Sequence, residues 1–206
     1  MRLDWIATCL ALTLLVGPVA AGDQAQKQQA AENKAEVLEQ KAAENSNPAP
    51  VPKAEAITPS EVQAVDPKGA APLDDAITCL ARSIYWEAKG EDPADMEAVA
   101  NVVMNRLGHQ GFPDTVCKVV KQGSETKSCQ FSWWCDGKSD SVQEEVPYAM
   151  AKEIARKALN KELPDRTQGA LYFHDRTVKP DWAEEYIRTV DIGLFRFYKP
   201  HGESAK

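Results

Sequence analysis

The 206-residue chain contains only three histidines, which are far apart, and it contains no Cys-x-x-Cys pair. Zinc sites usually combine such closely spaced ligands. The sequence also lacks a basic stretch or a nucleic-acid-binding motif, and its net charge is −7. We therefore expect no metal or other cofactor and no nucleic-acid partner.

Aromatic residues are absent from positions 22–73, a stretch rich in Ala, Gln, Glu, Lys and Pro. Such a composition buries too little apolar surface to offset the entropy that is lost on ordering. Residues 24–44 are compatible with a transient polar helix, and the proline-rich part that follows should be extended. We predict that 22–73 is a disordered linker that acts as a tether.

Long apolar runs are also scarce, and the main one extends from Trp5 to Val19, after Arg2. The small residues that end with Ala21 are typical of a signal-peptide cleavage site, and the run is short for crossing a bilayer. We predict that residues 1–21 are a signal peptide. The protein would then be exported to the periplasm or cell wall, without stable membrane insertion after cleavage. An uncleaved membrane anchor is the alternative.

The remaining stretch, 76–200, is long enough for one hydrophobic core. Its apolar periodicity predicts helices near 77–90, 93–107, 112–122 and 147–163. Residues 169–174 and 190–198 are rich in aromatic and β-branched side chains and favour short strands. We predict a single, mainly helical α+β domain with a small β region, and we expect a monomer.

The first of these helices is the most informative. Asp74 or Asp75 can cap its start, and Gly90 can end it in a left-handed conformation. Glu87 then lies in the last turn among apolar neighbours, where the helix carries partial negative charge. Both surroundings disfavour the ionised carboxyl and raise its pKa, which suits Glu87 to general acid catalysis. The alternative is an ordinary solvated acid at a helix end.

A second informative stretch is Cys129 to Asp140, in which two cysteines enclose Phe131, Trp133 and Trp134. Aromatic faces commonly stack against sugar rings, and the Gln, Ser and Asp side chains nearby can bind hydroxyl groups. We place this stretch on an irregular hairpin. If the hairpin is regular, the two tryptophans point to opposite faces, and we expect Trp133 in the cleft and Trp134 in the packing.

Together these stretches resemble the cell wall hydrolase family of the spore-cortex-lytic enzyme (SleB/CwlJ) type. The resemblance covers roughly Ile77 to Tyr198, with its pieces in the family's order. The pieces are Cys79-Leu80-Ala81, Tyr85-x-Glu87-Ala88-x-Gly90-Glu91, Ala98-Val99-Ala100-Asn101-Val102-Val103-x-Asn105-Arg106, Phe112-Pro113-x-Thr115-Val116-Cys117, Cys129-Gln130-Phe131-Ser132-Trp133, Cys135-Asp136-Gly137-Lys138, and His174 to Trp182.

The resemblance implies a lysozyme-like or lytic-transglycosylase-like catalytic domain that acts on peptidoglycan glycan strands. Glu87 would be its catalytic acid and base. The residues that we expect to contact the glycan are Tyr85, Asn101, Gln130, Phe131, Trp133, Asp136 and His174. For Asn101 and His174, an ordinary hydrogen-bonding role within the fold is the alternative.

Four cysteines remain after loss of the signal peptide, and an even number in an exported chain suggests two disulfides. Three pairings are possible. The short spacing of Cys129 and Cys135 suits a local bridge, which leaves Cys79 with Cys117. A zinc site is the alternative to disulfides.

Cleavage of a glycosidic bond needs a proton for the leaving oxygen and stabilisation of an oxocarbenium-like centre. In the chemistry that the resemblance implies, one carboxylate suffices. Glu87 first donates its proton and then accepts the proton of the C6 hydroxyl of N-acetylmuramic acid (MurNAc). The bond to N-acetylglucosamine (GlcNAc) is thereby replaced by a 1,6-anhydro ring.

Three alternatives remain open. A hydrolytic muramidase would use Glu91, Asp136 or Asp140 as a second acid. An N-acetylmuramoyl-L-alanine amidase would need a zinc cluster, which three scattered histidines disfavour. A non-catalytic wall-binding module would grip glycan through Trp133 and Trp134.

Overall fold

A computed structural model describes residues 18–44, 51–126 and 129–202. Residues 1–17, most of the predicted signal peptide, lie outside the described residues. Helix α1 (Pro18–Glu44) begins within the last residues of the predicted signal peptide. The predicted cleavage after Ala21 would therefore remove the first turn of this helix. None of the described helices combines the length and apolarity that a membrane span requires.

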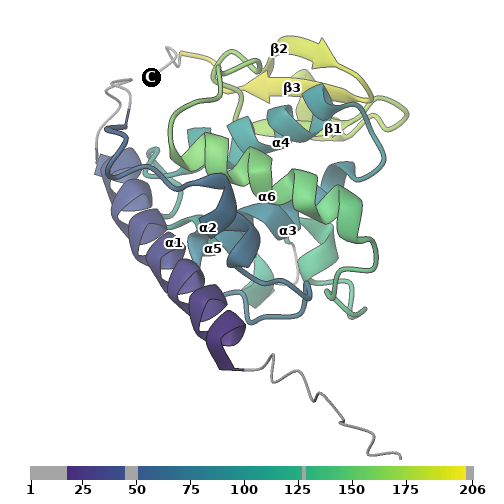
Figure 1. Ribbon diagram of the computed structural model, residues 1–206. Coiled ribbons are helices and arrows are strands. Elements are labelled where there is room, and N and C mark those ends of the chain that lie inside the picture. Colours follow the sequence, from purple (N-terminus) through teal and green to yellow (C-terminus); the bar gives the residue numbers. More distant parts are fainter. Residues whose placement is uncertain (1–17, 45–50, 127–128, 203–206) are drawn as a thin grey trace, which may run out of the picture.

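The described residues form six α-helices, three short 3-10 helices and a three-stranded antiparallel sheet. After α1 the elements are α2 (Pro59–Ala64), α3 (Ala76–Ala88), α4 (Pro93–Arg106), α5 (Val116–Lys121), η1 (Ser124–Thr126), η2 (Ser132–Trp134), α6 (Glu145–Leu159), β1 (Tyr172–Asp175), η3 (Asp181–Glu184), β2 (Ile187–Ile192) and β3 (Phe195–Lys199). Figure 1 shows α1 along one side of the helical body and the sheet at the top of the view.

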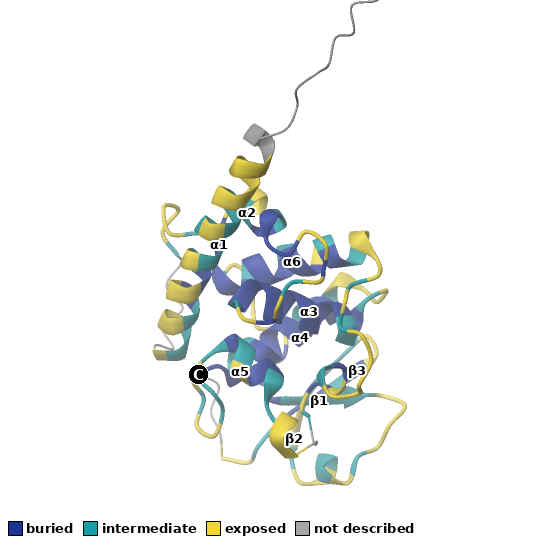
Figure 2. Ribbon diagram, turned by 90° about the horizontal axis from the view of Figure 1, so that it is seen from below, coloured by how far each residue is buried: buried dark blue, intermediate teal, exposed yellow. Residues whose placement is uncertain are grey.

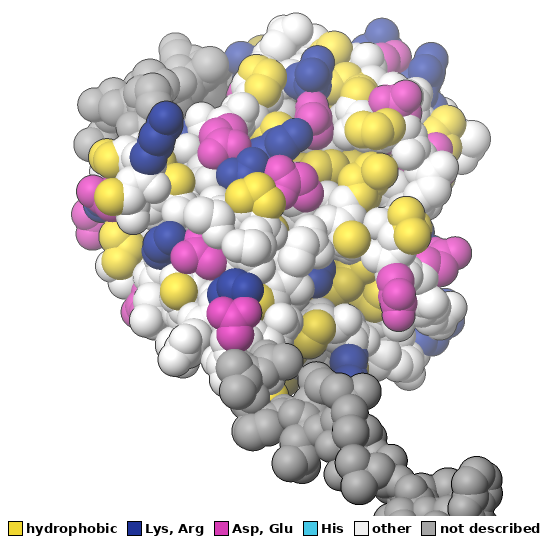
Figure 3. Space-filling view, viewed as in Figure 1, with side chains coloured by type: hydrophobic (Ala, Val, Ile, Leu, Met, Phe, Trp, Pro, Cys, Tyr) yellow, Lys and Arg dark blue, Asp and Glu magenta, His cyan; other side chains and the backbone are white. Residues whose placement is uncertain are grey.

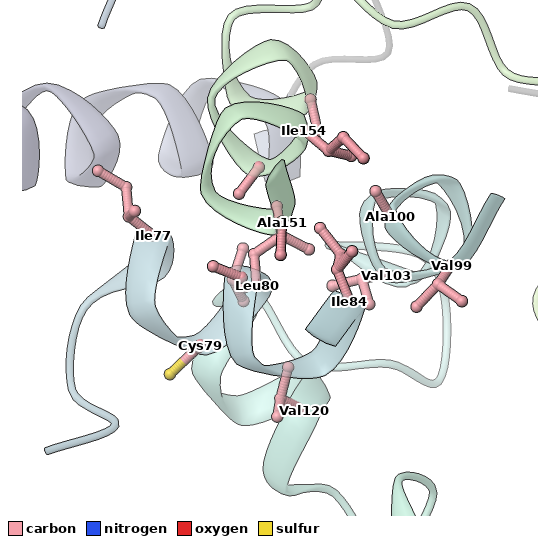
Figure 4. Packing of buried hydrophobic residues seen from close by; sticks show 14 of the residues in the cluster. Ile77, Cys79, Leu80, Ile84, Val99, Ala100, Val103, Val120, Ala151 and Ile154 are labelled. Carbon is pink, nitrogen blue, oxygen red and sulfur yellow. The ribbon is translucent and has the colours of Figure 1, made fainter. Parts of the chain in front are cut away.

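Helix α3 is the centre of the core, and eleven of its thirteen residues are buried. It packs against α4, α5 and α6, and Figure 2 shows α3, α4 and α6 as the most buried part of the molecule. The apolar side chains that meet there include Leu80 and Ile84 of α3, Val99, Ala100 and Val103 of α4, Val120 of α5, and Ala151 and Ile154 of α6 (Figure 4). The predicted apolar face of the 77–90 helix is therefore the core of the fold.

The helix ends follow from local chemistry. The Asp75 side chain caps α3, Asp92 caps α4 with Pro93 at its first position, and Gly90 adopts φ +85° after α3. The predicted helix at 112–122 begins later than expected, because Thr115 rather than the residue before Pro113 supplies the cap.

The sheet order is β1-β3-β2, so the predicted strand at 190–198 is in fact a hairpin of two strands. Gly193 makes its turn with φ +48°, and a β-carbon at this position would run into the carboxylate of Asp95. Asp95 is buried in the first turn of α4. The close approach of Asp95 and Gly193 thus joins the start of α4 to the β2–β3 turn.

The prediction that residues 22–73 are disordered is wrong for the described part of that segment. Helix α1 packs on the body through Ala31, Ala35 and Leu38, all buried. These residues follow the four- and three-residue spacing of a narrow helix stripe. Because the stripe consists of a few small or medium apolar side chains, the overall composition of the segment does not reveal it.

Residues 51–73 are also part of the fold rather than a linker. Ile57, Val62 and Val65 are buried, and the N–H of Ile57 donates to Asn160 Oδ1 at 2.9 Å. Asp66 accepts hydrogen bonds from the Arg82 guanidinium at 2.7–3.0 Å and from the Tyr148 hydroxyl at 2.7 Å. The ordered body therefore begins well before residue 76, and composition missed it because these contacts come from distant parts of the chain.

Both predicted disulfides are present, Cys79–Cys117 and Cys129–Cys135, with Cα–Cα distances of 5.2 and 6.1 Å. The first joins α3 to α5. The second closes the loop that contains η2, and this loop forms a 3-10 turn instead of the predicted hairpin.

The molecular face in Figure 3 mixes Lys and Arg with Asp and Glu, without a large patch of one charge.

Candidate active site

A cleft of about 720 Å³ lies between the end of the helical body and the sheet. This volume is within the range of sites for small ligands. Its lining residues come from the ends of α3 and α4, from the 129–132 loop, and from the sheet with its connections. They are Glu87, Arg106, Cys129, Gln130, Ser132, Tyr172, Phe173, His174, Asp175, Val178, Pro180, Trp182, Tyr186 and Phe195.

Glu87 lies in the last turn of α3 and lines the cleft. Burial removes water from its carboxyl and raises its pKa from 4.5 to about 7, although the positive charge of Arg106 opposes the shift. No hydrogen bond from the described residues contributes to this shift. A carboxyl with this pKa holds its proton over much of the neutral range and can also lose it, as an acid that later acts as a base must do.

Arg106 is the last residue of α4 and is 3% exposed, although it lines the cleft. Its Nε donates to the backbone carbonyl of Leu171 at 2.7 Å. The rings of Phe112, Phe131 and Tyr172 surround the guanidinium with centroids at 5.3–5.5 Å. Desolvation lowers the pKa of Arg106 from its usual value to about 10, so the group remains positively charged at neutral pH.

Aromatic rings form one wall of the cleft. The rings of Tyr172 and Tyr186 stack with centroids 4.7 Å apart, and Trp182 contacts both at 5.8–5.9 Å. His174 stacks on Tyr198 at 5.2 Å and meets Trp182 edge-on at 5.6 Å. A wall of this kind presents flat apolar faces of the type that pack against sugar rings.

Two polar residues at the end of β1 complete this wall. The Nδ1 of His174 lies 2.7 Å from the carbonyl oxygen of Asp175, which can only accept, so Nδ1 carries a hydrogen. Its Nε2 lies 3.0 Å from the Tyr198 hydroxyl. The Asp175 carboxylate accepts from the hydroxyl and the N–H of Thr177, and these bonds lower the pKa of Asp175.

Three residues expected in the site do line the same cleft, namely Glu87, Gln130 and His174. Tyr85 does not: it is fully buried, and its hydroxyl bonds to the N–H of Gln143 at 3.2 Å. Asn101 does not line it either, because its Oδ1 accepts from the N–H of Arg166 at 3.0 Å. Asp136 pairs with Lys138 at an exposed turn away from the cleft lining.

Neither tryptophan lines the cleft, so Trp133 is not where it was expected, whereas Trp134 packs against the core as expected. Trp133 is 7% exposed and belongs to the core, whereas Trp134 is partly exposed and carries Lys121 Nζ 5.1 Å from its ring centre. The period-two argument failed because η2 is a 3-10 turn rather than a strand. Phe131 is fully buried beneath the cleft, where it contacts Phe173 and Arg106.

Sequence reasoning missed several lining residues, notably Arg106, Tyr172, Asp175, Trp182 and Tyr186. Arg106 and Trp182 stand within the motif pieces, but nothing in the spacing of those pieces shows which side chains face a cleft. Among the described residues, no group of three or more His, Cys, Asp or Glu side chains is placed to hold a metal ion. The ligand set of a zinc amidase is therefore not assembled in this part of the chain.

Comparisons with known proteins find similarity to a cell wall hydrolase family and to spore cortex-lytic enzymes. The family model described as Cell Wall Hydrolase matches residues 90–198, starting three positions after Glu87. Two curated relatives are both named spore cortex-lytic enzyme. The one from Halalkalibacterium halodurans is 28% identical over 125 residues, and the one from Oceanobacillus iheyensis is 29% identical over 124 residues.

These matches cover 59% and 60% of this chain but only 34% and 41% of the two relatives. The chain thus spans well under half the length of the curated relatives that it matches. The crystal structure of the catalytic domain of the Bacillus cereus SleB protein superposes with a TM-score of 0.50 at 27% identity. The superposition covers 60% of this chain and 89% of that domain. The predicted mainly helical α+β fold with a small β region is confirmed.

Proposed function

The chain belongs to the cell wall hydrolase family, and from this membership we propose that it is an exported enzyme that cleaves the MurNAc–GlcNAc bond of peptidoglycan. The observation that carries the proposal is the setting of Glu87. Its carboxyl is desolvated at a helix end, has a pKa of about 7, and faces a cleft with an aromatic wall. A proton donor beside a surface that packs against sugar rings fits glycosidic cleavage.

The reaction we propose is that of a lytic transglycosylase. Neutral Glu87 donates its proton to the glycosidic oxygen as the bond from that oxygen to MurNAc C1 breaks, and positive charge develops at C1. The C6 hydroxyl oxygen of the same sugar then bonds to C1, and its proton passes to the Glu87 carboxylate. Glu87 regains its starting state, no water is consumed, and the MurNAc end becomes a 1,6-anhydro ring.

Two features of the cleft support this reaction. Gln130 and Ser132 are exposed at its edge, where their side chains can bind sugar hydroxyl or acetamido groups. Trp182 and Tyr186 are partly buried within the aromatic wall and can hold a sugar ring against it. The substrate would thus be held by polar groups at the edge of the cleft and by the aromatic wall.

A hydrolytic muramidase is the second candidate, because the cleft does contain another carboxylate. Asp175 lines it, whereas Glu91, Asp136 and Asp140, the second acids considered from sequence, do not. The hydrogen bonds from Thr177 keep Asp175 ionised, which suits a base or a nucleophile in the hydrolytic reaction. The two candidates therefore differ in the role of Asp175.

Mass spectrometry of a purified peptidoglycan digest tests both candidates. Transglycosylation yields muropeptides that are lighter by one water than the hydrolytic products, and Asp175→Asn should then retain the product type. Reducing MurNAc ends, together with loss of activity in Asp175→Asn, would establish hydrolysis instead. Release of free stem peptides, with zinc bound to the active protein, would point to an amidase. Binding without any turnover would leave a wall-binding module.

A further inference from the structure

We propose that Arg106 is the positioning residue for Glu87: its caged guanidinium stabilises the carboxylate that forms each time Glu87 gives up its proton. This inference rests on the proposed function, because it concerns the second half of the acid–base cycle. The observations behind it are the burial of Arg106, the incomplete hydrogen bonding of its guanidinium, and its place on the wall of the cleft that Glu87 also lines.

The first observation is that the guanidinium is held in place. Its Nε is fixed by the carbonyl of Leu171, and three aromatic rings surround it. Leu171 precedes β1, which carries cleft residues, so Arg106 links the end of α4 to the sheet side of the cleft. A charge that cannot move away offers a fixed potential to a neighbouring group.

The second observation is that this charge has no anionic partner in direct contact within the described part of the chain. The Nη1 atom is buried and has no hydrogen-bond partner there. Leaving a buried charged donor unpaired is costly, and native proteins usually avoid it. A fold that keeps such a donor at the wall of a cleft thus has a charge available for a carboxylate that appears only during turnover.

The charged and titratable groups around Glu87 come from three parts of the fold. Arg106 comes from α4, Tyr172, His174 and Asp175 from β1, and Tyr186 from the loop after η3. Of these groups, Arg106 is the one whose charge acts on the Glu87 carboxyl, and the interaction favours the ionised form. The reverse influence is also present, because Glu87 and Tyr172 act on Arg106.

The two halves of the reaction make opposite demands on Glu87. Desolvation favours the neutral acid that protonates the glycosidic oxygen, but alone it would make the resulting carboxylate very unstable. Arg106 offsets part of that cost without neutralising Glu87 through a salt bridge. The stabilised carboxylate then accepts the proton of the C6 hydroxyl, and this transfer returns Glu87 to its neutral form.

Arginine suits this position better than lysine would. A guanidinium retains its charge under desolvation that would deprotonate an ammonium group, and its flat face stacks on aromatic rings. The Arg106 cage uses both properties, since its centre lies 5.3–5.5 Å from three ring centroids. We therefore expect Arg106→Lys to lose part of the effect even where it folds.

The test is a carbon-13 NMR titration of the Glu87 carboxyl carbon in the full exported chain, without substrate. Arg106→Gln keeps hydrogen-bonding groups but removes the charge, and the Glu87 midpoint should rise by about one pH unit. Arg156→Gln is the matched control, because Arg156 is also a buried arginine but does not line the cleft. Its Glu87 midpoint should equal that of the native protein.

A second measurement needs no change at Arg106. The Arg106 Cζ signal should shift with pH at the Glu87 midpoint in the native chain, and this shift should vanish in Glu87→Gln. An unchanged Glu87 midpoint in folded Arg106→Gln, or an Arg106 signal that ignores Glu87, overturns the inference. Because both titrations omit substrate, a chain that shows this coupling but cleaves no glycan would overturn the proposed function alone.

Discussion

Asn160 and Ile57 are joined by two hydrogen bonds although they lie 103 positions apart in the sequence. The N–H of Ile57 donates to Asn160 Oδ1, and Asn160 Nδ2 donates to the carbonyl of Ile57, both at 2.9 Å. The Asn160 side chain, 2% exposed, thus satisfies both backbone groups of Ile57, which is 1% exposed. This pair fastens the N-terminal segment to the end of α6.

Asn160→Ala should therefore destabilise the protein by about 1–3 kcal/mol, because the N–H of Ile57 would remain buried without a partner. Chemical denaturation of the purified protein measures the change. Asn33→Ala is the control, since Asn33 Oδ1 accepts a hydrogen bond from Gln29 on an exposed face of α1. Equal stabilities of the two variants would show that segment 51–73 is not anchored in this way.

The pKa of Glu87 predicts how stability depends on pH. Its folded-state pKa of about 7 is above the ordinary value of 4.5, so the folded state binds more protons than the unfolded state between these values. The stabilisation from neutral Glu87 is complete below pH 4.5 and is lost as pH rises through 7. At about 1.4 kcal/mol per pH unit, the loss is roughly 3 kcal/mol.

Glu87→Gln removes this titration. The difference in unfolding free energy between the variant and the native protein should change by roughly 3 kcal/mol from pH 4.5 to pH 7.5, in favour of the variant. Activity of the variant should fall by about 10²–10⁴-fold. A pH-independent difference would mean that the Glu87 carboxyl is not desolvated in solution.

The two neighbouring tryptophans should respond very differently to truncation. Trp133→Ala leaves a cavity in the core and should cost about 3–5 kcal/mol. Trp134 is only partly buried, where it packs on the edge of the core with Lys121 over its ring, so Trp134→Ala should cost less, about 1–2 kcal/mol. Thermal melting of both variants in parallel distinguishes the two roles, and a larger loss for Trp134→Ala would contradict the placement of these side chains.

The two disulfides should contribute unequally to stability. The Cys79–Cys117 bridge closes a loop of 38 residues and the Cys129–Cys135 bridge one of 6. Loop-closure entropy assigns them about 4 and 2 kcal/mol respectively. Paired Cys→Ser variants of each bridge, compared by denaturant titration, measure the two contributions, and the order of the costs should follow the loop lengths.

Sequence reasoning succeeded where a pattern is local. The α3 helix, its Asp75 cap and the turn at Gly90 follow from residues within one stretch, and so does the placement of Glu87 among apolar neighbours. The disulfide pairs followed from spacing and number. In each case either the interacting residues are a few positions apart in the sequence or, for the cysteines, few pairings are possible.

Sequence reasoning failed where contacts between distant parts of the chain determine whether a side chain is buried or lines the cleft. The buried stripe of α1 is three small or medium side chains, and only the surface of the body makes it a core element. Tyr85 and Asn101 stand in the motif pieces, but their polar groups bond to Gln143 and Arg166 instead of facing the cleft. Motif membership marks a residue as part of the architecture without telling which side of a helix meets the substrate.

The link between Ile57 and Asn160 also sets an order of assembly. The partner that Ile57 needs is not available until a further hundred or so residues have been synthesised or translocated. Contacts between such distant positions form late, because a long loop must close before they are gained. The Cys79–Cys117 region can meanwhile collapse and oxidise. The docking of Ile57 on the end of α6 thus completes late, and until then the backbone groups of Ile57 lack the partner that satisfies them in the folded protein.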